Sequence, residues 1–326
     1  PLYLCTSIPL HLYTFAPLYL YTSIPLHLSL LLTHQNIVQK VMTITSQSIP
    51  KILSKNSARL RMNELGKQGE AFFFLFDFEL QKPIVYTKSE LKKSGIWFDI
   101  NGKKNFNLSR KFPVTKKVVL EKEPLSKPTY EKAFQLVQAE INAGNSYLLN
   151  LTFPTAIQTN LSLSEIFLRS QARYKLLMKS GVVVYSPEIF VQIKDGKIKS
   201  FPMKGTIDAS VSNAAAVILA DKKEKAEHCT IVDLIRNDLN LVASEVKVER
   251  FRYIEKIQTK QKDLLQVSSE ISGTLPENYA EHIGDILMKL LPAGSISGAP
   301  KKKTVEIIRA AEGQERGYYT GVFGYF

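Results

Sequence analysis

Short apolar runs bounded by turn residues mark the strands expected in this chain. Residues 71–78 are rich in aromatic side chains, and a run of this length and composition predicts a buried strand. Similar runs predict strands over residues 83–86, 95–98, 118–120, 147–153, 181–185, 189–193, 197–202, 246–248 and 267–271. The Asp195-Gly196 pair between two of these runs is typical of a tight hairpin turn.

Stretches with apolar residues at three- and four-residue steps predict helices between the groups of strands. Residues 130–142 carry Phe134, Val137 and Ile141 on one face, with Thr129 as the N-cap. The same periodicity predicts helices over residues 163–170, 221–238, 280–291 and 300–311. Because the strands cluster in antiparallel groups with helices between them, the pattern indicates an α+β fold and not a doubly wound parallel sheet.

The start of the chain departs from this pattern. Residues 1–32 are a tandem repeat in which proline recurs at positions 1, 9, 17 and 25. Such regular prolines forbid a transmembrane helix, and the basic region of a signal peptide is missing. We therefore expect a repetitive, non-native segment without function over residues 1–41, a strand-rich region over 42–123 and a catalytic region over 124–326.

The composition favours a packed protein that attracts small anions. The chain has 326 residues, and 44% of them are hydrophobic, which suffices for one large core or two ordinary ones. The formal net charge is +13, but the lysines are spread along the chain and no nucleic-acid motif accompanies them. Cys5 and Cys229 are the only cysteines in the sequence, which excludes a disulfide framework and favours a reducing, cytoplasmic compartment.

Two residues in the middle of the chain, Glu188 and Lys204, are candidates for catalysis or ligand binding. Glu188 lies on a turn between predicted strands, where most glutamates are merely solvated. Lys204 ends a predicted strand directly before Gly205, a residue that allows a ligand to approach the backbone closely. Taken alone, a lysine in this position is usually a surface charge.

The helix predicted over residues 221–238 carries a possible metal ligand. Glu227 offers hard oxygen atoms that suit Mg²⁺, which typically takes one or two carboxylates together with ligand oxygens. Asp233, Arg236 and Asn237 form a polar cluster on the same helix. Such a cluster must be hydrogen-bonded if it is buried, and we expect its role to be structural.

Two further segments with candidate binding residues lie near the end of the chain. Gly294 and Ser295 begin a glycine- and serine-rich loop that leads through Pro300 into a helix. Free backbone amides and hydroxyls at a helix start can bind an anion, although a plain N-cap loop is the simpler interpretation. Tyr319 brings a hydroxyl group to the start of the terminal apolar run.

Taken together and in this order, the five segments resemble the chorismate-utilising enzymes, a family that includes anthranilate synthase component I and aminodeoxychorismate synthase component I. The helix motif Val232-Asp233-Leu234-Ile235-Arg236-Asn237-Asp238 and the loop over residues 294–301 carry the resemblance, which runs from about Thr129 to Phe326. It implies antiparallel β-sheets packed as a sandwich core flanked by helices, chorismate as substrate and Mg²⁺ as cofactor.

The residue at position 204 distinguishes two kinds of enzyme within the family. Anthranilate synthases carry alanine in this position, whereas aminodeoxychorismate synthases carry lysine. The resemblance therefore implies that Lys204 is a nucleophile that adds to the chorismate ring, that Glu188 is the general acid and that Glu227 binds Mg²⁺. It also implies a substrate site lined by Gly205, Thr206, Gln266, Gly294, Ser295 and Tyr319. Gln266 stands where the family often has histidine, so no acid–base role is expected for it.

The implied reaction is the amination of chorismate to 4-amino-4-deoxychorismate in folate biosynthesis. The chain lacks the Cys/His triad of a glutaminase, so ammonia is expected from a separate glutamine amidotransferase subunit. Neither a nucleic acid nor a membrane is expected as a partner.

Two alternatives stay open. One is anthranilate synthase component I, against which Lys204 counts. The other is an inactive truncated relic, because the family continues beyond Phe326 with an arginine-bearing strand, a glycine-rich loop, and a helix with a second magnesium glutamate. We therefore expect little or no activity from these 326 residues alone.

Overall fold

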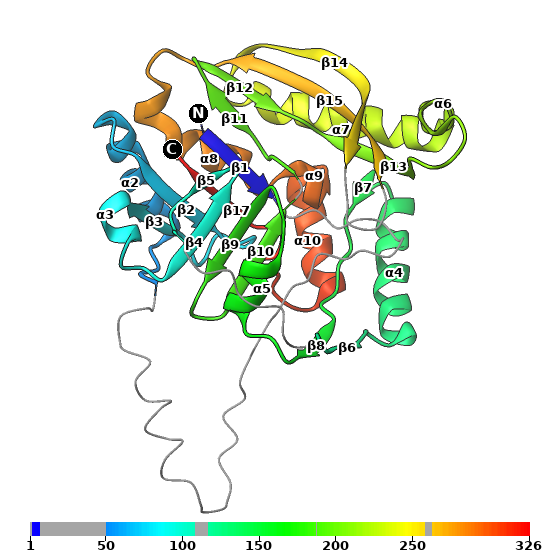
Figure 1. The fold of residues 1–326 in the computed structure, drawn as a ribbon. Helices are drawn as coiled ribbons and strands as arrows, with labels where there is room; N and C mark the ends of the chain where they lie inside the picture. The colour runs from blue at the N-terminus through cyan, green and yellow to red at the C-terminus, as the bar shows by residue number, and fades with distance from the viewer. Residues whose placement is uncertain (1, 7–49, 108–116, 187, 258–262) are drawn as a thin grey trace, which may run out of the picture.

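The computed structural model describes residues 2–6, 50–107, 117–186, 188–257 and 263–326 (Figure 1). In this part of the chain, two antiparallel sheets pack against each other through apolar side chains, and helices pack against the other face of the larger sheet. The predicted α+β class and the packed antiparallel sheets are therefore confirmed.

The larger sheet contains nine strands in the described residues, and all of their pairings are antiparallel. Its order is β13 (Met203–Asp208), β15 (Leu264–Thr274), β12 (Lys197–Ser200), β11 (Gln192–Lys194), β1 (Leu2–Thr6), β17 (Val322–Tyr325), β2 (Phe72–Phe76) and β3 (Ile84–Thr87), with β14 (Ser244–Ile257) paired to β15. Asp195 and Gly196 join β11 to β12 with φ angles of 51° and 71°, the left-handed conformations of the predicted hairpin turn.

Strand β1 lies between β11 and β17 and pairs with both of them. Leu2 is opposite Ile193, and Tyr3 is opposite Tyr325. Five residues of the repetitive segment thus take part in the sheet, whereas residues 7–41 lie outside the described residues. The three predicted regions of the chain stay predictions.

The smaller sheet has four strands among the described residues. Its order is β10 (Val182–Ser186), β9 (Tyr174–Met178), β4 (Ile96–Ile100) and β5 (Lys103–Lys104). Two short pairs lie apart from both sheets, β16 (Gly298–Ala299) with β7 (Leu148–Leu149) and β6 (Leu120–Glu123) with β8 (Ala156–Thr159).

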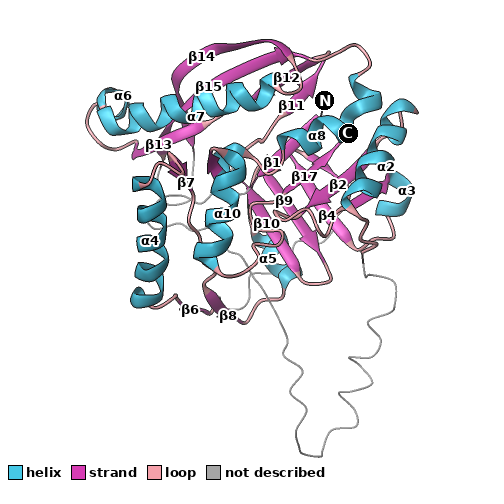
Figure 2. Cartoon of the chain, turned by 180° about the vertical axis from the view of Figure 1, so that it is seen from behind, coloured by secondary structure: helices cyan, strands magenta, loops and turns pink. Residues whose placement is uncertain are grey.

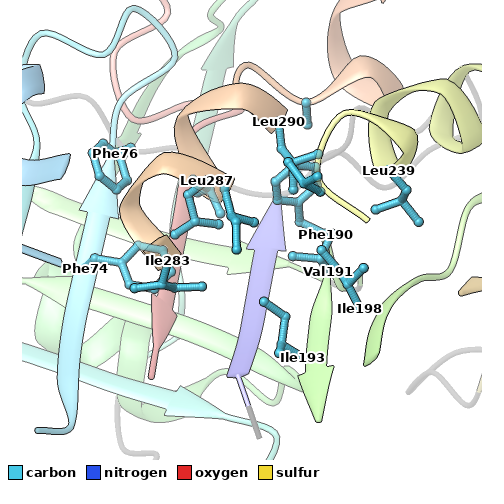
Figure 3. Packing of buried hydrophobic residues seen from close by; sticks show 14 of the residues in the cluster. Phe74, Phe76, Phe190, Val191, Ile193, Ile198, Leu239, Ile283, Leu287 and Leu290 are labelled. Atoms are coloured by element: carbon cyan, nitrogen blue, oxygen red, sulfur yellow. The ribbon is translucent and has the colours of Figure 1, made fainter. Parts of the chain in front are cut away.

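The predicted aromatic strand is β2, which is buried on both faces. On one face, Phe73 stacks on Phe98 of β4 with 5.4 Å between the ring centroids, and this contact joins the two sheets. On the other face, Phe74 and Phe76 lie beneath Leu287 and its neighbours in the helical layer (Figure 3). Two-sided burial explains why the sequence shows a continuous apolar run here and no alternation.

Helices cover the larger sheet and fill the space beside it (Figure 2). They are α2 (Lys55–Lys67), α3 (Lys88–Leu91), α4 (Lys127–Asn142), α5 (Leu163–Arg169), α6 (Ala214–Ala220), α7 (Lys222–Asn240), a 3₁₀ turn (Tyr279–His282), α8 (Ile283–Leu290), α9 (Gly294–Ser297) and α10 (Lys301–Glu312). Helix α7 packs along the β14–β15 hairpin, and α4 packs beside α10. Among the described helices, none has the length and apolar character needed to span a membrane.

Several predicted boundaries differ from the structure. Helix α4 begins earlier than predicted because the Ser126 side chain accepts a hydrogen bond from the backbone N–H of Thr129, which makes Ser126 the N-cap. Phe134 on this helix is 42% exposed, so the buried face is formed by Ala133 and Val137 instead. The strand predicted over residues 147–153 is reduced to the two residues of β7, and β9 was not predicted.

We expect Leu287→Ala to lower the free energy of unfolding by about 2–5 kcal/mol, because Leu287 is fully buried between α8 and β2. The matched control is Leu60→Ala on α2, where the side chain is 51% exposed and the expected change is about 0.5 kcal/mol or less. Urea denaturation of both variants measures the difference. Equal losses of unfolding free energy in the two variants would contradict the burial of Leu287 in the core.

Candidate functional site

Lys204 lies in a bulge of strand β13. Met203 pairs with Ser268 and Thr206 with Gln266, so β13 has one residue more than β15 between these two pairs. Gly205 takes up the irregularity with a φ of 84°, a left-handed conformation that suits glycine. The prediction that Lys204 ends a strand is wrong in this detail, because β12 ends at Ser200 and Lys204 belongs to the next strand.

Close packing also restricts position 205. A Cβ atom on Gly205 would lie 3.1 Å from Oε2 of Glu224 and 3.4 Å from Cδ1 of Ile218. Glu224 is in the first turn of α7, whose N-cap Asp221 accepts a hydrogen bond from its backbone N–H. The Glu224 carboxylate therefore lies beside the bulge, a neighbour that the sequence pattern did not indicate.

Glu188 is buried on the link between the two sheets, and only 5% of it is exposed. The Ser186 hydroxyl accepts a hydrogen bond from the backbone N–H of Glu188 and donates one to its carbonyl oxygen. Burial raises the pKa of the Glu188 carboxyl to about 8, while the positive charge of Lys204 acts in the opposite direction. The carboxyl is thus mostly protonated at neutral pH, and Glu188 is not one of the solvated turn residues that its position alone suggested, while its role as general acid stays a prediction.

Glu227 lies on α7 with 31% of its side chain exposed. Its Oε1 is 3.6 Å from Nζ of Lys223, one turn earlier on the helix. Within the described part of the chain, no three His, Cys, Asp or Glu side chains form a ready-made metal site. A single open carboxylate nevertheless fits a Mg²⁺ site in which the remaining ligands are substrate oxygens and water.

His228, the next residue, is fully buried beneath the hairpin. Its Nε2 is 2.7 Å from the hydroxyl oxygen of Ser269, and that oxygen also accepts a hydrogen bond from the backbone N–H of Arg252. Burial and then the charge of Arg252 lower the pKa of His228 to about 4, so the ring is neutral near pH 7. His228 was not among the predicted site residues, although its position beside Glu227 is visible in the sequence.

Thr206 and Gln266 are opposite each other in the β13–β15 pairing. Thr206 is exposed, whereas Gln266 is partly buried. The side-chain oxygen of Gln266 is buried and has no hydrogen-bond partner among the described residues. An acceptor in this state fits a ligand that donates a hydrogen bond.

Gly294 and Ser295 lie in the short helix α9 and not in the predicted loop, and α9 packs against the other end of α7. A Cβ atom on Gly294 would lie 2.9 Å from Oδ2 of Asp238, which explains the glycine. Lys301 forms an ion pair of 2.8 Å with Asp238 and also donates to the carbonyl of Leu290. Asp238 is eleven residues beyond Glu227, so Gly294 meets α7 about 16 Å along the helix from that carboxylate.

A buried ion pair supports Tyr319 and the same loop. Arg316 and Glu312 are each 2% exposed and 2.6 Å apart. Arg316 donates to the carbonyl of Ile296, and Glu312 accepts from the backbone N–H of Thr152. Burial raises the pKa of Tyr319 to about 12, which keeps its hydroxyl protonated.

The polar cluster on α7 is exposed, not buried. Arg236 donates to Asp233 at 3.3 Å, and Asn237 donates to the same carboxylate at 3.4 Å. The side chain of Asp233 is 66% exposed. The buried acid of this motif is Asp238.

We expect Glu188→Gln to change how stability depends on pH. The folded-state pKa of Glu188 is about 8, above its ordinary value of 4.5, so the folded protein holds this proton more tightly than the unfolded chain. The neutral carboxyl makes its full contribution to the free energy of unfolding below about pH 4.5, and this contribution is lost as pH rises toward 8. It amounts to at most about 1.4 kcal/mol for each unit by which the folded-state pKa exceeds the ordinary value.

Denaturation at a series of pH values measures this dependence. Glu188→Gln should remove the decline between pH 4.5 and 8, whereas the exposed control Glu70→Gln should keep it. A decline of equal slope in Glu188→Gln and the parent protein would show that Glu188 is not the group responsible.

Comparisons with known proteins bear on the family and the fold of this chain. A family model described as "chorismate binding enzyme" matches residues 51–326. An uncharacterized PabA-like protein of Pasteurella multocida is 53% identical over 264 residues, which cover 81% of each chain. Anthranilate synthase component 1 of Aquifex aeolicus is 37% identical over 151 residues, 44% of this chain and 29% of that protein.

Aminodeoxychorismate synthase component 1 of Salmonella typhimurium is 32% identical over 217 residues, 60% of this chain and 45% of that protein. Among solved structures, the menaquinone-specific isochorismate synthase of Escherichia coli matches with a TM-score of 0.57 at 13% identity, over 86% of this chain and 72% of that one. At this identity, the structural likeness concerns the fold alone.

Proposed function

This chain belongs to the family of chorismate binding enzymes, and on that basis we propose that it aminates chorismate to 4-amino-4-deoxychorismate for p-aminobenzoate and folate biosynthesis. The observation that carries the proposal is the proximity of Lys204 to Glu188. An amine in a strand bulge lies close enough to a buried carboxyl to influence its pKa. The Lys204 amine can add to the ring, while the Glu188 carboxyl can give up a proton.

The proposed reaction has two substitutions. Once deprotonated, the Lys204 amine forms a bond to C2 of chorismate, the ring double bonds shift, and the C4–O bond breaks. Glu188 protonates the departing hydroxyl, which leaves as water. Ammonia then forms a bond to C4, the double bonds shift back, the bond between C2 and Lys204 breaks, and the new ammonium group at C4 returns a proton to the Glu188 carboxylate. The net change is the exchange of the C4 hydroxyl for an amino group, with water as the other product.

Several residues near Lys204 fit a ring that carries carboxylates and hydroxyl groups. Gly205 lets the bulge pack directly against Glu224 and Ile218. The buried side-chain oxygen of Gln266 can accept a hydrogen bond from a hydroxyl group of the substrate, and we assign Thr206, Gly294, Ser295 and Tyr319 to the substrate carboxylates and ring. We assign Glu227 to Mg²⁺, which when bound offsets the charge of the ring carboxylate.

We further propose that ammonia comes from a glutamine amidotransferase subunit and that the enzyme is cytoplasmic. The free thiol of Cys229 is exposed on α7. A helical cysteine without a neighbouring glycine turn does not fit a glutaminase nucleophile.

Product analysis tests the proposed reaction. With chorismate, Mg²⁺ and an ammonium salt, the product of the protein should be 4-amino-4-deoxychorismate, at the low rate expected of these 326 residues, and Lys204→Ala should abolish or redirect that product because the amine that attacks C2 is gone. Lys197→Ala, an exposed lysine on the neighbouring strand β12, is the control and should leave the rate unchanged. Anthranilate formed by the parent protein would favour anthranilate synthase, and the absence of both products would favour an inactive chain.

Glu227→Gln should raise the Mg²⁺ concentration needed for half-maximal activity on the order of 10-fold or more, because the amide is a weaker ligand than the carboxylate. Titration of activity with Mg²⁺ measures this change. The control variant Glu70→Gln should titrate like the parent protein, and the same result for Glu227→Gln would remove Glu227 from the metal site.

A further inference from the structure

A row of polar side chains crosses the four described strands of the smaller sheet at one level. Lys175 of β9 is opposite Tyr185 of β10 on one side and opposite Asp99 of β4 on the other. Asp99 is in turn opposite Lys104 of β5. Directly opposite residues of antiparallel strands project to the same face of a sheet. Leu177, two residues beyond Lys175, packs against α5 on this face, so the row lies on the side away from the larger sheet.

A cavity of about 420 Å³ opens over three members of this row, Lys175, Asp99 and Lys104. Its other walls are Arg173 and the loop over residues 170–172 that follows α5. Arg173 precedes Lys175 by two residues, the spacing that places two side chains on one face of a strand. Three cations against one carboxylate leave the lining with a net charge of +2.

The carboxylate of Asp99 is already occupied. Its Oδ1 accepts a hydrogen bond from the backbone N–H of Gly102 at 2.9 Å, and its Oδ2 is 3.3 Å from Nζ of Lys104. Arg173 donates through Nε to the side chain of Asn101 at 3.2 Å. Within the described part of the chain, the two Nη atoms of Arg173 form no hydrogen bond, so the open edge of the guanidinium is available to a ligand.

Lys175 is the buried cation of the cavity, with 9% of the residue exposed. Its Nζ donates to the carbonyls of Phe167 and Ser170, each at 3.0 Å. These bonds satisfy carbonyls at the end of α5, which alone would explain a lysine here. Both acceptors are neutral, however, and a buried ammonium is normally paired with an anion. Burial lowers the pKa of the Lys175 amine, the direction expected of a cation that lacks such a partner.

We infer that this cavity binds a phosphate group, either as free phosphate or on a small phosphorylated metabolite. A phosphate group carries a charge of about −1.5 to −2 at pH 7, which matches the net charge of the lining. The two Nη atoms of Arg173 can donate to two of its oxygens at once. Lys175 has three N–H groups, and the third one remains for the ligand after the two carbonyls are served.

The phosphate site is separate from the proposed amination site. Its residues come from β4, β5, β9 and the loop after α5, whereas Lys204 lies on β13 of the larger sheet. The inference therefore goes beyond the proposed function and can be tested without chorismate.

Calorimetric titration of the whole protein with inorganic phosphate, without chorismate and Mg²⁺, tests the inference. The parent protein should bind phosphate saturably at one site. Arg173→Gln should lower the association constant at least about 10-fold, because the charged hydrogen bonds of the guanidinium are lost. The control Lys179→Gln removes an equal charge from an exposed residue about 13 Å farther along the strand, and it should change the constant less than about 2-fold because salt screens that distance.

Asp99→Asn distinguishes an anion site from a cation site. The amide does not repel phosphate, so this variant should bind it several-fold more tightly than the parent protein. A cation held by Asp99 would give the reverse result, and weaker phosphate binding in Asp99→Asn would overturn the inference.

Ethyl phosphate distinguishes the two sources of the group. Binding as tight as that of inorganic phosphate would assign the site to a phosphorylated metabolite, and exclusion of the ester would assign it to the free anion. Tighter binding of malonate than of phosphate would overturn the choice of phosphate.

Absence of saturable binding by the parent protein, or equal losses in Arg173→Gln and Lys179→Gln, would also overturn the inference. If Arg173→Gln does not fold, Lys104→Gln takes its place, because its side chain is half-exposed and the same direction is expected. A protein that binds phosphate but does not aminate chorismate would refute the proposed function alone.

Discussion

The packing of β2 between the smaller sheet and the helical layer is the constraint on which the site depends. Phe73 and Leu75 face the smaller sheet, and Phe72, Phe74 and Phe76 face the helices. Because the two sheets are joined in this way, the chain that leaves β10 in one sheet must cross the sandwich to enter β11 in the other. Glu188 lies on that crossing, and its burial follows from the path of the chain.

Each acid that the fold buries near the site is compensated in a different way. Asp238 has an ion pair with Lys301, and Glu312 has one with Arg316 and a backbone N–H besides. These partners replace hydrogen bonds that water would supply, although burial still raises the pKa of Asp238. Glu188 has no cation in contact with its carboxylate among the described salt bridges, and only the field of Lys204 opposes its desolvation. It therefore holds its proton, the state that a general acid requires.

The sequence predicted the parts of this structure that depend on local patterns. The Asp195-Gly196 turn, the span of α7 and the buried aromatic strand follow from turn chemistry, helical periodicity and continuous apolar runs. The family was visible in motif order. Long-range packing was not visible, so the turn at Glu188 alone did not show that this carboxyl is buried, and the bulge at Lys204 was expected to be a strand end. His228 was passed over because nothing in its own segment shows that Ser269, 41 residues away, is its partner.

The way in which the bulge is held bears on how one fold can support two reactions. Gly205 sets the conformation of the bulge through its φ angle, and the pairs Met203–Ser268 and Thr206–Gln266 fix the bulge at its two ends. None of these features uses the side chain of residue 204. A lysine or an alanine can therefore occupy this position on the same backbone, with the carboxyl of Glu188 and the oxygen of Gln266 unchanged around it. On this view, the choice between amination at C4 and the anthranilate reaction depends on whether a nucleophilic amine stands at position 204, while the surrounding elements serve both reactions equally.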